Sequence, residues 1–138
     1  MPLQTVEELN RWRSGLPALV GFEVTAAEPG HLQAIMPIRA DLLAPNGYLH
    51  AASVIALADS SCGFATMLDL PDGATGFTTI ELKSNHTGTA LDGVLTCEAR
   101  RAHYGRSTQV WDAEVRVQST GKTIALFRCT QMILYAKR

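Results

Sequence analysis

The chain has 138 residues, of which 46% are hydrophobic and 18% charged, a balance typical of one globular domain and not of a disordered chain. Twelve basic residues against thirteen acidic ones leave a formal net charge of -1, which disfavours nucleic acid and anionic membranes as partners. The cysteines Cys62, Cys97 and Cys129 are widely spaced and show no metal-binding pattern. We therefore expect a single cytoplasmic domain over residues 1–138, with no metal and no bound cofactor.

The N-terminal segment predicts a short helix. Thr5 is placed to cap it, with Glu8 at the position that completes a capping box, and the helix is expected to end near Gly15. The charges of this segment lie at helical spacing without an apolar run, so we do not expect a signal peptide. Residues 22–27 and 31–37 then predict a β-hairpin around a Pro-Gly turn.

One long helix is predicted in the middle of the chain, from His50 to about Leu68. A loop rich in proline, asparagine and glycine precedes it over residues 41–48. The helix is apolar or small on nearly every side, which indicates burial on most sides. Its longest weakly polar run, residues 54–58, is expected to be too short to span a bilayer.

The second half of the chain predicts one antiparallel sheet. All six prolines lie within the first 71 residues, and proline is excluded from central strands because it has no N–H to donate. Residues alternate with period two over 94–103, 108–118 and 123–135, and short turns separate these runs. With residues 76–86 ahead of them, we expect a four-stranded meander. The complete pattern predicts an α+β fold, with the sheet wrapped around the central helix as in the hotdog arrangement.

Asp59 is the only ionisable residue between His50 and Asp69. A carboxylate removed from water is costly unless it finds partners, so its place in an apolar helix needs an explanation. One interpretation is that Asp59 emerges at an edge and accepts hydrogen bonds from a neighbouring loop. The other is a catalytic carboxylate with a shifted pKa at the floor of a pocket.

His50 lies where the central helix begins. A histidine in this position is either structural, fixing the preceding loop through its ring nitrogens, or part of a site. The N–H groups of Ala51 and Ala52 at the helix N-terminus can polarise a carbonyl oxygen. His50 and Asp59 are about 2.5 turns apart, on opposite sides of the helix, so a compact site within one chain cannot easily use both. A site between two subunits could combine the helix start of one chain with the carboxylate of the other.

The segments 47–52 (Gly-Tyr-Leu-His-Ala-Ala) and 57–60 (Leu-Ala-Asp-Ser) resemble the hotdog-fold acyl-CoA thioesterases. The most similar group is the phenylacetate-degradation (PaaI-like) type, which is related to the 4-hydroxybenzoyl-CoA thioesterases. The family pattern is Gly-x-x-His-Gly-Gly with a carboxylate nine residues after the histidine, and Asp59 has this spacing. Residues 81–86 also resemble the central strand of the family, and the resemblance covers residues 17–135.

The resemblance implies roles for individual residues. Asp59 would act as general base toward water or as nucleophile on the thioester carbonyl, and the N–H of Ala51 would polarise that carbonyl. Thr79, with Thr78 as the next match, would help to position the water. No cofactor is implied, because a thioester is an activated acyl donor that a base, an oriented water and one oxyanion donor can hydrolyse.

Two departures from the family pattern affect the surroundings of the carboxylate. The two glycines after the histidine are replaced by Ala51 and Ala52, which keep the N–H groups but add methyl groups that narrow the site. The family commonly has Asn or Gln six residues before the histidine, where this chain has Ala44; Asn46 could substitute if the loop turns differently.

The resemblance therefore implies an acyl-CoA thioesterase that acts as a homodimer or homotetramer, with active sites at the subunit interface. Two alternatives remain open on the same fold: a hydratase or dehydratase, and a non-catalytic acyl-CoA-binding module. Arginines at positions 100, 101 and 106 could meet phosphates, although arginines beside a hairpin are more often solvated.

Overall fold

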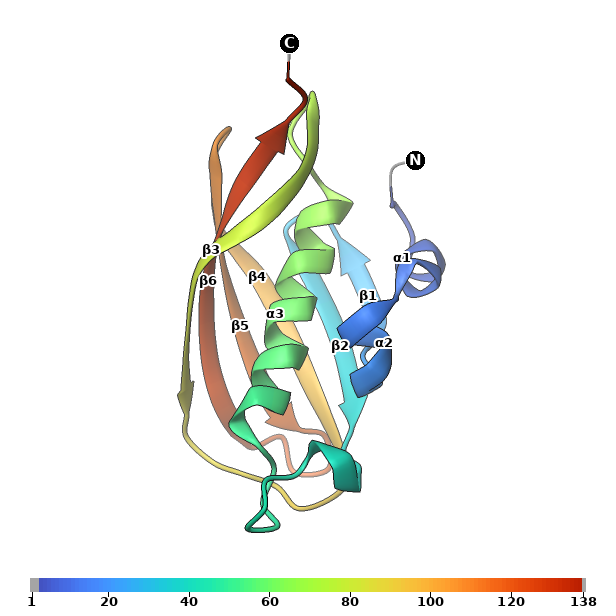
Figure 1. The fold of residues 1–138 in the computed structure, drawn as a ribbon, viewed down its shortest axis with the longest axis vertical. Coiled ribbons are helices and arrows are strands. Elements are labelled where there is room, and N and C mark those ends of the chain that lie inside the picture. Colours follow the sequence, from blue (N-terminus) through green and yellow to red (C-terminus); the bar gives the residue numbers. More distant parts are fainter. Residues whose placement is uncertain (1–2, 138) are drawn as a thin grey trace.

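The structure is a computed structural model that describes residues 3–137. Three α-helices, one 3-10 turn and six strands make up this part of the chain (Figure 1). In chain order they are α1 (Val6–Trp12), α2 (Gly15–Val20), β1 (Glu23–Glu28), β2 (His31–Pro37), the 3-10 turn Ala40–Leu42, α3 (Ala51–Leu68), β3 (Ala74–His86), β4 (Val94–Tyr104), β5 (Thr108–Val117) and β6 (Thr123–Tyr135).

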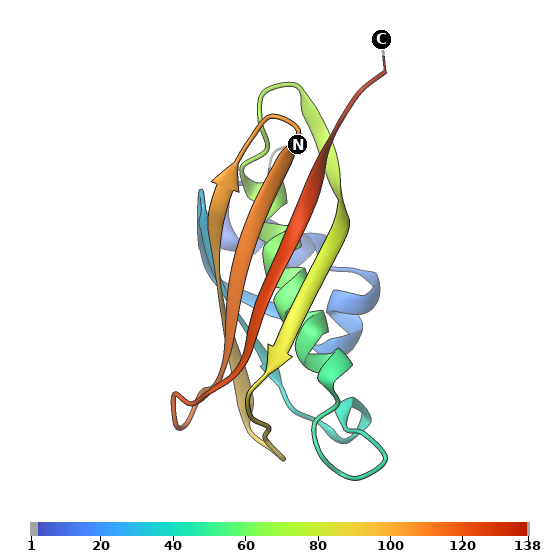
Figure 2. The ribbon, with the colours of Figure 1, turned by 90° about the vertical axis from the view of Figure 1, so that its left-hand side faces the viewer.

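The six strands form one antiparallel sheet in the order β1-β2-β4-β5-β6-β3. The sheet curves around α3, which contacts every strand and runs along its concave side (Figures 1 and 2). The small side chains of α3 allow this close approach; Leu57, Ala58 and Ala65, for example, are completely buried. The predicted hotdog fold and its central helix are therefore confirmed.

The predicted four-stranded meander is wrong in one respect. β4, β5 and β6 do form a meander, but β3 is not next to β4. It pairs with β6 at one edge of the sheet, and β4 pairs with β2, which joins the N-terminal hairpin to the same sheet. The alternation of apolar residues reports which face of a strand is buried and carries no information about its neighbours.

The N-terminal segment holds one helix more than predicted. Thr5 caps α1 as expected, since its hydroxyl oxygen accepts a hydrogen bond from the N–H of Glu8 over 3.1 Å. However, α1 ends at Trp12, and α2 begins at Gly15. Pro17 is compatible with α2 because it lies in the first turn, where a missing N–H costs no helical hydrogen bond. Gly21 ends α2 with a φ of 81°.

α3 is long and apolar enough to cross a membrane by length and composition alone. The prediction from its short weakly polar run is therefore wrong on these two criteria, because the helix as a whole, Asp59 and its serines included, has 18 residues and a mean hydropathy of 1.4. In this structure α3 packs against the sheet on one side and against α2 on another. Its position is that of a core helix.

Candidate active site

The start of α3 is organised by His50. Its backbone has the extended conformation of a helix cap, and its Nδ1 accepts a hydrogen bond from the N–H of Ala52 over 2.9 Å. The N–H of His50 in turn donates to the carbonyl of Leu42, and the hydroxyl of Ser53 donates to the same carbonyl. The structural interpretation of His50 is thus supported, because its ring and backbone tie the helix start to the preceding loop.

The N–H of Ala51 remains available at this helix terminus. Nδ1 of His50 accepts the N–H of Ala52, whereas the adjacent N–H of Ala51 makes no hydrogen bond within residues 3–137. Ala51 is exposed, so a ligand can reach this donor. Free N–H groups carry the positive end of the helix dipole, which favours a negatively charged oxygen. The N–H of Ala51 is therefore a donor on an exposed residue, and its role in polarising a carbonyl stays a prediction.

Asp59 lies half-buried on α3 without a partner. Its Oδ1 is buried, and no hydrogen bond or ion pair from the described residues reaches the side chain. Burial raises the pKa of Asp59 above its usual value of 3.8, because the charged form loses hydration that nothing replaces. The hydrogen bonds from a neighbouring loop that would make Asp59 purely structural are not found among these residues.

The positions of Thr79 and Asp59 are related through the contact between α3 and β3. The two elements run in opposite directions (Figure 1), and they touch where Gly63 meets the ring of Phe77. Asp59 is one turn before Gly63, about 6 Å along the helix, and shares its face. Thr79 is two residues after Phe77, about 6.6 Å along the strand, and also shares its face. Asp59 and Thr79 therefore lie on the same side of the Gly63–Phe77 contact, each on the face that its element turns toward the other.

The other two predicted residues are positioned differently. Thr78 is exposed, and strand alternation places it on the face of β3 opposite to Thr79. Asn46 is exposed in the loop before α3, where its Oδ1 accepts a hydrogen bond from the N–H of Tyr48 over 3.1 Å and closes a tight turn with Gly47. Asn46 thus shapes the loop that leads to His50, and it lies close in sequence to the start of α3.

The donor and the carboxylate are separated within one chain. Asp59 is eight residues after Ala51, which is about 12 Å along the axis of α3. An oxyanion donor must lie about 2.7–3.1 Å from the oxygen that it stabilises. The N–H of Ala51 and the carboxylate of Asp59 in the same chain are therefore too far apart to act on one carbonyl group.

Two buried glutamines on the concave face of the sheet were not predicted. Gln109 and Gln131 are opposite each other on β5 and β6, and both are fully buried. Gln109 Oε1 accepts a hydrogen bond from Trp111 Nε1, and Gln131 Oε1 accepts one from Thr79 Oγ1. The signal was present in the sequence, since Gln109 continues the inward period-two positions that contain Trp111.

Arg101 also differs from the expectation of a solvated hairpin arginine. Its side chain is 14% exposed and forms an ion pair with Asp69 over 3.1 Å. The guanidinium carbon lies 3.9 Å from the centre of the Tyr104 ring, in a cation–π contact. Arg101 therefore fastens the end of α3 to β4, whereas Arg100 and Arg106 are exposed.

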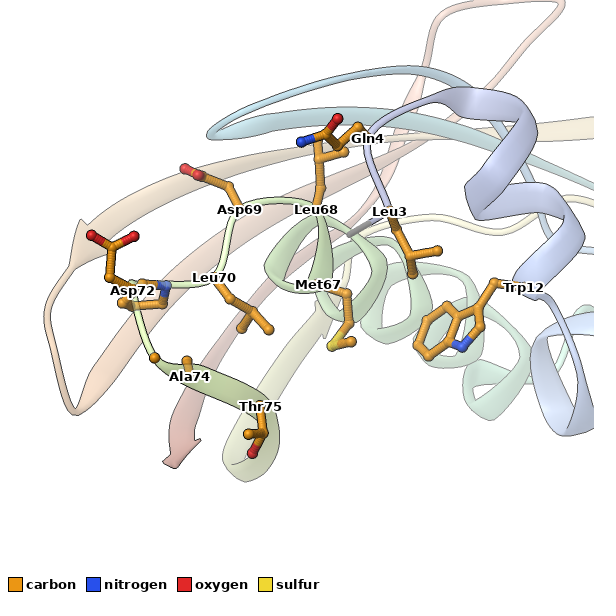
Figure 3. Close-up of a pocket in the computed structure, with 12 residues that line it drawn as sticks. Leu3, Gln4, Trp12, Met67, Leu68, Asp69, Leu70, Asp72, Ala74 and Thr75 are labelled. Carbon is orange, nitrogen blue, oxygen red and sulfur yellow. The ribbon is translucent and has the colours of Figure 1, made fainter. Parts of the chain in front are cut away.

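A cavity of about 790 Å³ opens at the C-terminal end of α3 (Figure 3). It is lined by the end of the helix, the turn that follows it and the N-terminal segment, including Met67, Asp72 and Trp12. Asp59 and Thr79 do not line this cavity. Within residues 3–137, no three His, Cys, Asp or Glu side chains are grouped in a way that could hold a metal ion.

Comparisons with solved structures agree with this architecture. A mutant thioesterase from Pseudomonas aeruginosa superposes with a TM-score of 0.87 at 29% identity, covering 94% of each chain. A thioesterase from Haemophilus influenzae superposes with a TM-score of 0.88 at 26% identity, covering 98% of this chain and 96% of the other.

Comparisons with characterised sequences lead to the same group of enzymes. A 1,4-dihydroxy-2-naphthoyl-CoA hydrolase from Listeria monocytogenes is 30% identical over 118 residues, which cover 84% of this chain and 93% of the relative. The proofreading thioesterase EntH from Klebsiella pneumoniae is 34% identical over 98 residues, covering 71% of each chain. Residues 46–128, which include α3 and most of the sheet, match the family model of the thioesterase superfamily. The chain therefore belongs to the thioesterase superfamily and is a thioester hydrolase.

Proposed function

We propose that this thioester hydrolase acts on acyl-CoA and that Asp59 is its general base. The observation that carries the proposal is the half-buried carboxylate of Asp59, which has a buried oxygen without a hydrogen-bond partner within residues 3–137. The raised pKa makes this carboxylate a stronger base than a solvated one. The CoA thioester follows from the relative of Listeria monocytogenes, which is a CoA-thioester hydrolase by name.

In the proposed reaction, Asp59 removes a proton from a water molecule as the water oxygen attacks the thioester carbonyl carbon. The carbonyl oxygen becomes an oxyanion, which the N–H of Ala51 stabilises. The intermediate then collapses, the carbon–sulfur bond breaks, and the CoA thiolate leaves with the proton returned by Asp59. The products are a free acid and CoA. In the alternative nucleophilic route, Asp59 itself attacks the carbonyl, and water then hydrolyses the resulting anhydride.

We further propose that the site is shared between two subunits. β3 supports this, because it is a 13-residue edge strand with one neighbour, β6, in the sheet. This strand exposes the side chains of Ile80 and Leu82. Their exposed fractions are 52% and 40%. A long edge strand with exposed apolar side chains is a ready partner for a second copy of itself. Such pairing would bring the helix start of one subunit toward Asp59 of the other.

The acyl group and the location of the protein are further parts of the proposal. An aromatic acyl group is supported by the naphthoyl-CoA hydrolase relative and by the resemblance to the phenylacetate-degradation group. A cytoplasmic location is supported by Cys62, Cys97 and Cys129, which are all free and buried.

The test is release of free CoA, followed with a thiol-reactive chromophore, across a panel of aryl- and alkyl-CoA thioesters. Asp59→Asn is expected to keep the fold and lose about 10²–10⁴-fold in kcat, because the amide cannot accept the proton from water. Asp72→Asn is the control, since Asp72 is exposed and lines the distant cavity. Near-normal turnover by Asp59→Asn on an accepted substrate would overturn the proposed mechanism.

A further inference from the structure

Gln131 makes one side-chain hydrogen bond in the part of the chain that the structure describes. Its Oε1 accepts the hydroxyl hydrogen of Thr79 over 2.6 Å, and the two residues are directly paired across β3 and β6. Gln131 is fully buried, whereas Thr79 is half-buried on the side of β3 that faces α3. The sheet register shifts immediately after Thr79, between Thr79 and Glu81. Such bulges re-aim side chains beside functional sites.

This hydrogen bond determines what the Thr79 hydroxyl can do. A threonine hydroxyl has one hydrogen to donate and two lone pairs that accept. When Gln131 takes the hydrogen, the hydroxyl can only accept a hydrogen bond from a further group. A water that reaches both Asp59 and Thr79 can therefore donate one hydrogen to each, and its own lone pair is left for the carbonyl carbon.

We propose that Gln131 is a positioning residue for the reaction, and that it acts by holding the Thr79 hydroxyl as an acceptor for the attacking water. The inference rests on the proposed function, in which Asp59 is the base. It assigns to β6 a residue that contributes to turnover without touching the substrate.

Packing alone does not account for Gln131. Its Nε2 is buried without a partner among the described residues, and an unpaired buried donor is unfavourable compared with an apolar side chain of similar shape. Gln109 Nε2 is likewise buried without a partner among these residues, but Gln109 has a packing role, because the donor that it serves is the buried indole N–H of Trp111, which requires an acceptor. The hydroxyl of half-buried Thr79 has no such requirement, since solvent or substrate water can reach it.

Gln109 therefore provides a matched control on the neighbouring strand. Gln131→Met and Gln109→Met remove the same group from equally buried positions. Gln131→Met is expected to lower kcat about tenfold with KM within about twofold, because one oriented hydrogen bond in the reaction is lost. Gln109→Met is expected to lower the melting temperature, because the buried N–H of Trp111 loses its acceptor, and to retain kcat. Gln131→Leu provides a second variant with the same expectation as Gln131→Met.

A double-mutant cycle with Thr79→Val gives the decisive measurement. If Gln131 acts through Thr79, Gln131→Met lowers kcat in the wild-type background and has no further effect in the Thr79→Val background. Additive losses, or equal losses in kcat for Gln131→Met and Gln109→Met, would overturn the inference while leaving the proposed function intact. Full activity of Asp59→Asn would instead show that the proposed function has failed, and this inference with it.

Discussion

The ring of Phe77 on β3 lies directly against Gly63 on α3, so close that a Cβ built on Gly63 would be 3.0 Å from Phe77 Cζ. This contact, one helical turn from Asp59, sets the distance between α3 and the edge strand β3. The absence of a side chain at Gly63 is therefore required for packing, although glycine disfavours a helix interior.

Gly63→Val tests this contact. The larger side chain is expected to destabilise the protein by about 1–3 kcal/mol and to reduce kcat, because overpacking pushes β3 and Thr79 away from α3. Urea denaturation and steady-state kinetics measure the two effects. Gly76→Ala is the control on the same strand, since a Cβ at Gly76 would meet no atom within 4 Å. Equal stability of Gly63→Val and the wild type would contradict the role of the contact.

The raised pKa of Asp59 predicts opposite effects of pH on activity and on stability. The base form is required for hydrolysis, so activity should fall as pH drops through the raised pKa. Between the unfolded and folded pKa values, the folded state holds the proton more tightly, so stability should fall as pH rises through this window. The cost of the unpartnered charge is then fully present above the raised pKa.

Asp59→Asn removes this cost together with the activity. We expect the variant to melt at a higher temperature than the wild type at neutral pH, and the difference to shrink as the pH falls below the usual pKa of 3.8, where Asp59 becomes protonated in both states. Differential scanning calorimetry at several pH values provides the measurement. A lower melting temperature for the variant at neutral pH would mean that Asp59 is stabilised by partners.

Ala51→Pro removes the proposed oxyanion donor with little change in structure. Proline is tolerated at the first helical position, and His50 has the extended backbone (ψ 135°) that a residue before proline requires. We expect kcat to fall about 10²–10³-fold while circular dichroism and the melting temperature stay near the wild-type values. Unchanged kcat in a folded Ala51→Pro variant would exclude this N–H from the reaction.

Mixing the two inactive variants tests whether the site is shared. If Ala51 and Asp59 act across subunits, a heterodimer of Ala51→Pro and Asp59→Asn contains one intact site of two. Random mixing should then restore about a quarter of wild-type activity, because half of the dimers are mixed. If both residues act within one chain, mixing after denaturation and refolding should restore none.

His50 offers a separate test of a structural against a chemical role. His50→Ala should cost about 0.5–2 kcal/mol, because the cap on the N–H of Ala52 is lost. Asparagine is a good cap, so His50→Asn should restore both stability and kcat. Chemical denaturation and kinetics on the two variants provide the comparison. A stable but inactive His50→Asn variant would show that the imidazole takes part in the reaction.

The β3 edge predicts how the subunits associate. Leu82→Lys places a charge on the exposed edge strand and should shift the protein toward monomer in sedimentation velocity, with a parallel loss of activity. Leu19→Lys is the control, since Leu19 is exposed on α2, on the other side of the molecule from β3 in Figure 1. A Leu82→Lys variant that sediments like the wild type would place the subunit interface elsewhere.

Features that depend on local pattern are predictable from the sequence. The cap at Thr5, the extent of α3 and the alternation of strands 4 to 6 all follow from residues close together in the chain, because helix and strand periods are local properties. The isolation of Asp59 is equally visible, since it interrupts a long apolar helix. The second N-terminal helix is missed because the helical segment was expected to end near Gly15, although the first turn of a new helix accepts Pro17.

The sequence by itself determined the six strands, the central helix and the one carboxylate in that helix, because these depend on patterns within a few residues. Only the tertiary structure decided that β3 pairs with β6, that Phe77 meets Gly63, and that Thr79 meets Gln131, a residue 52 positions away. Contacts at such separations arise when strands choose their neighbours, and this choice depends on the packing of the whole sheet around α3.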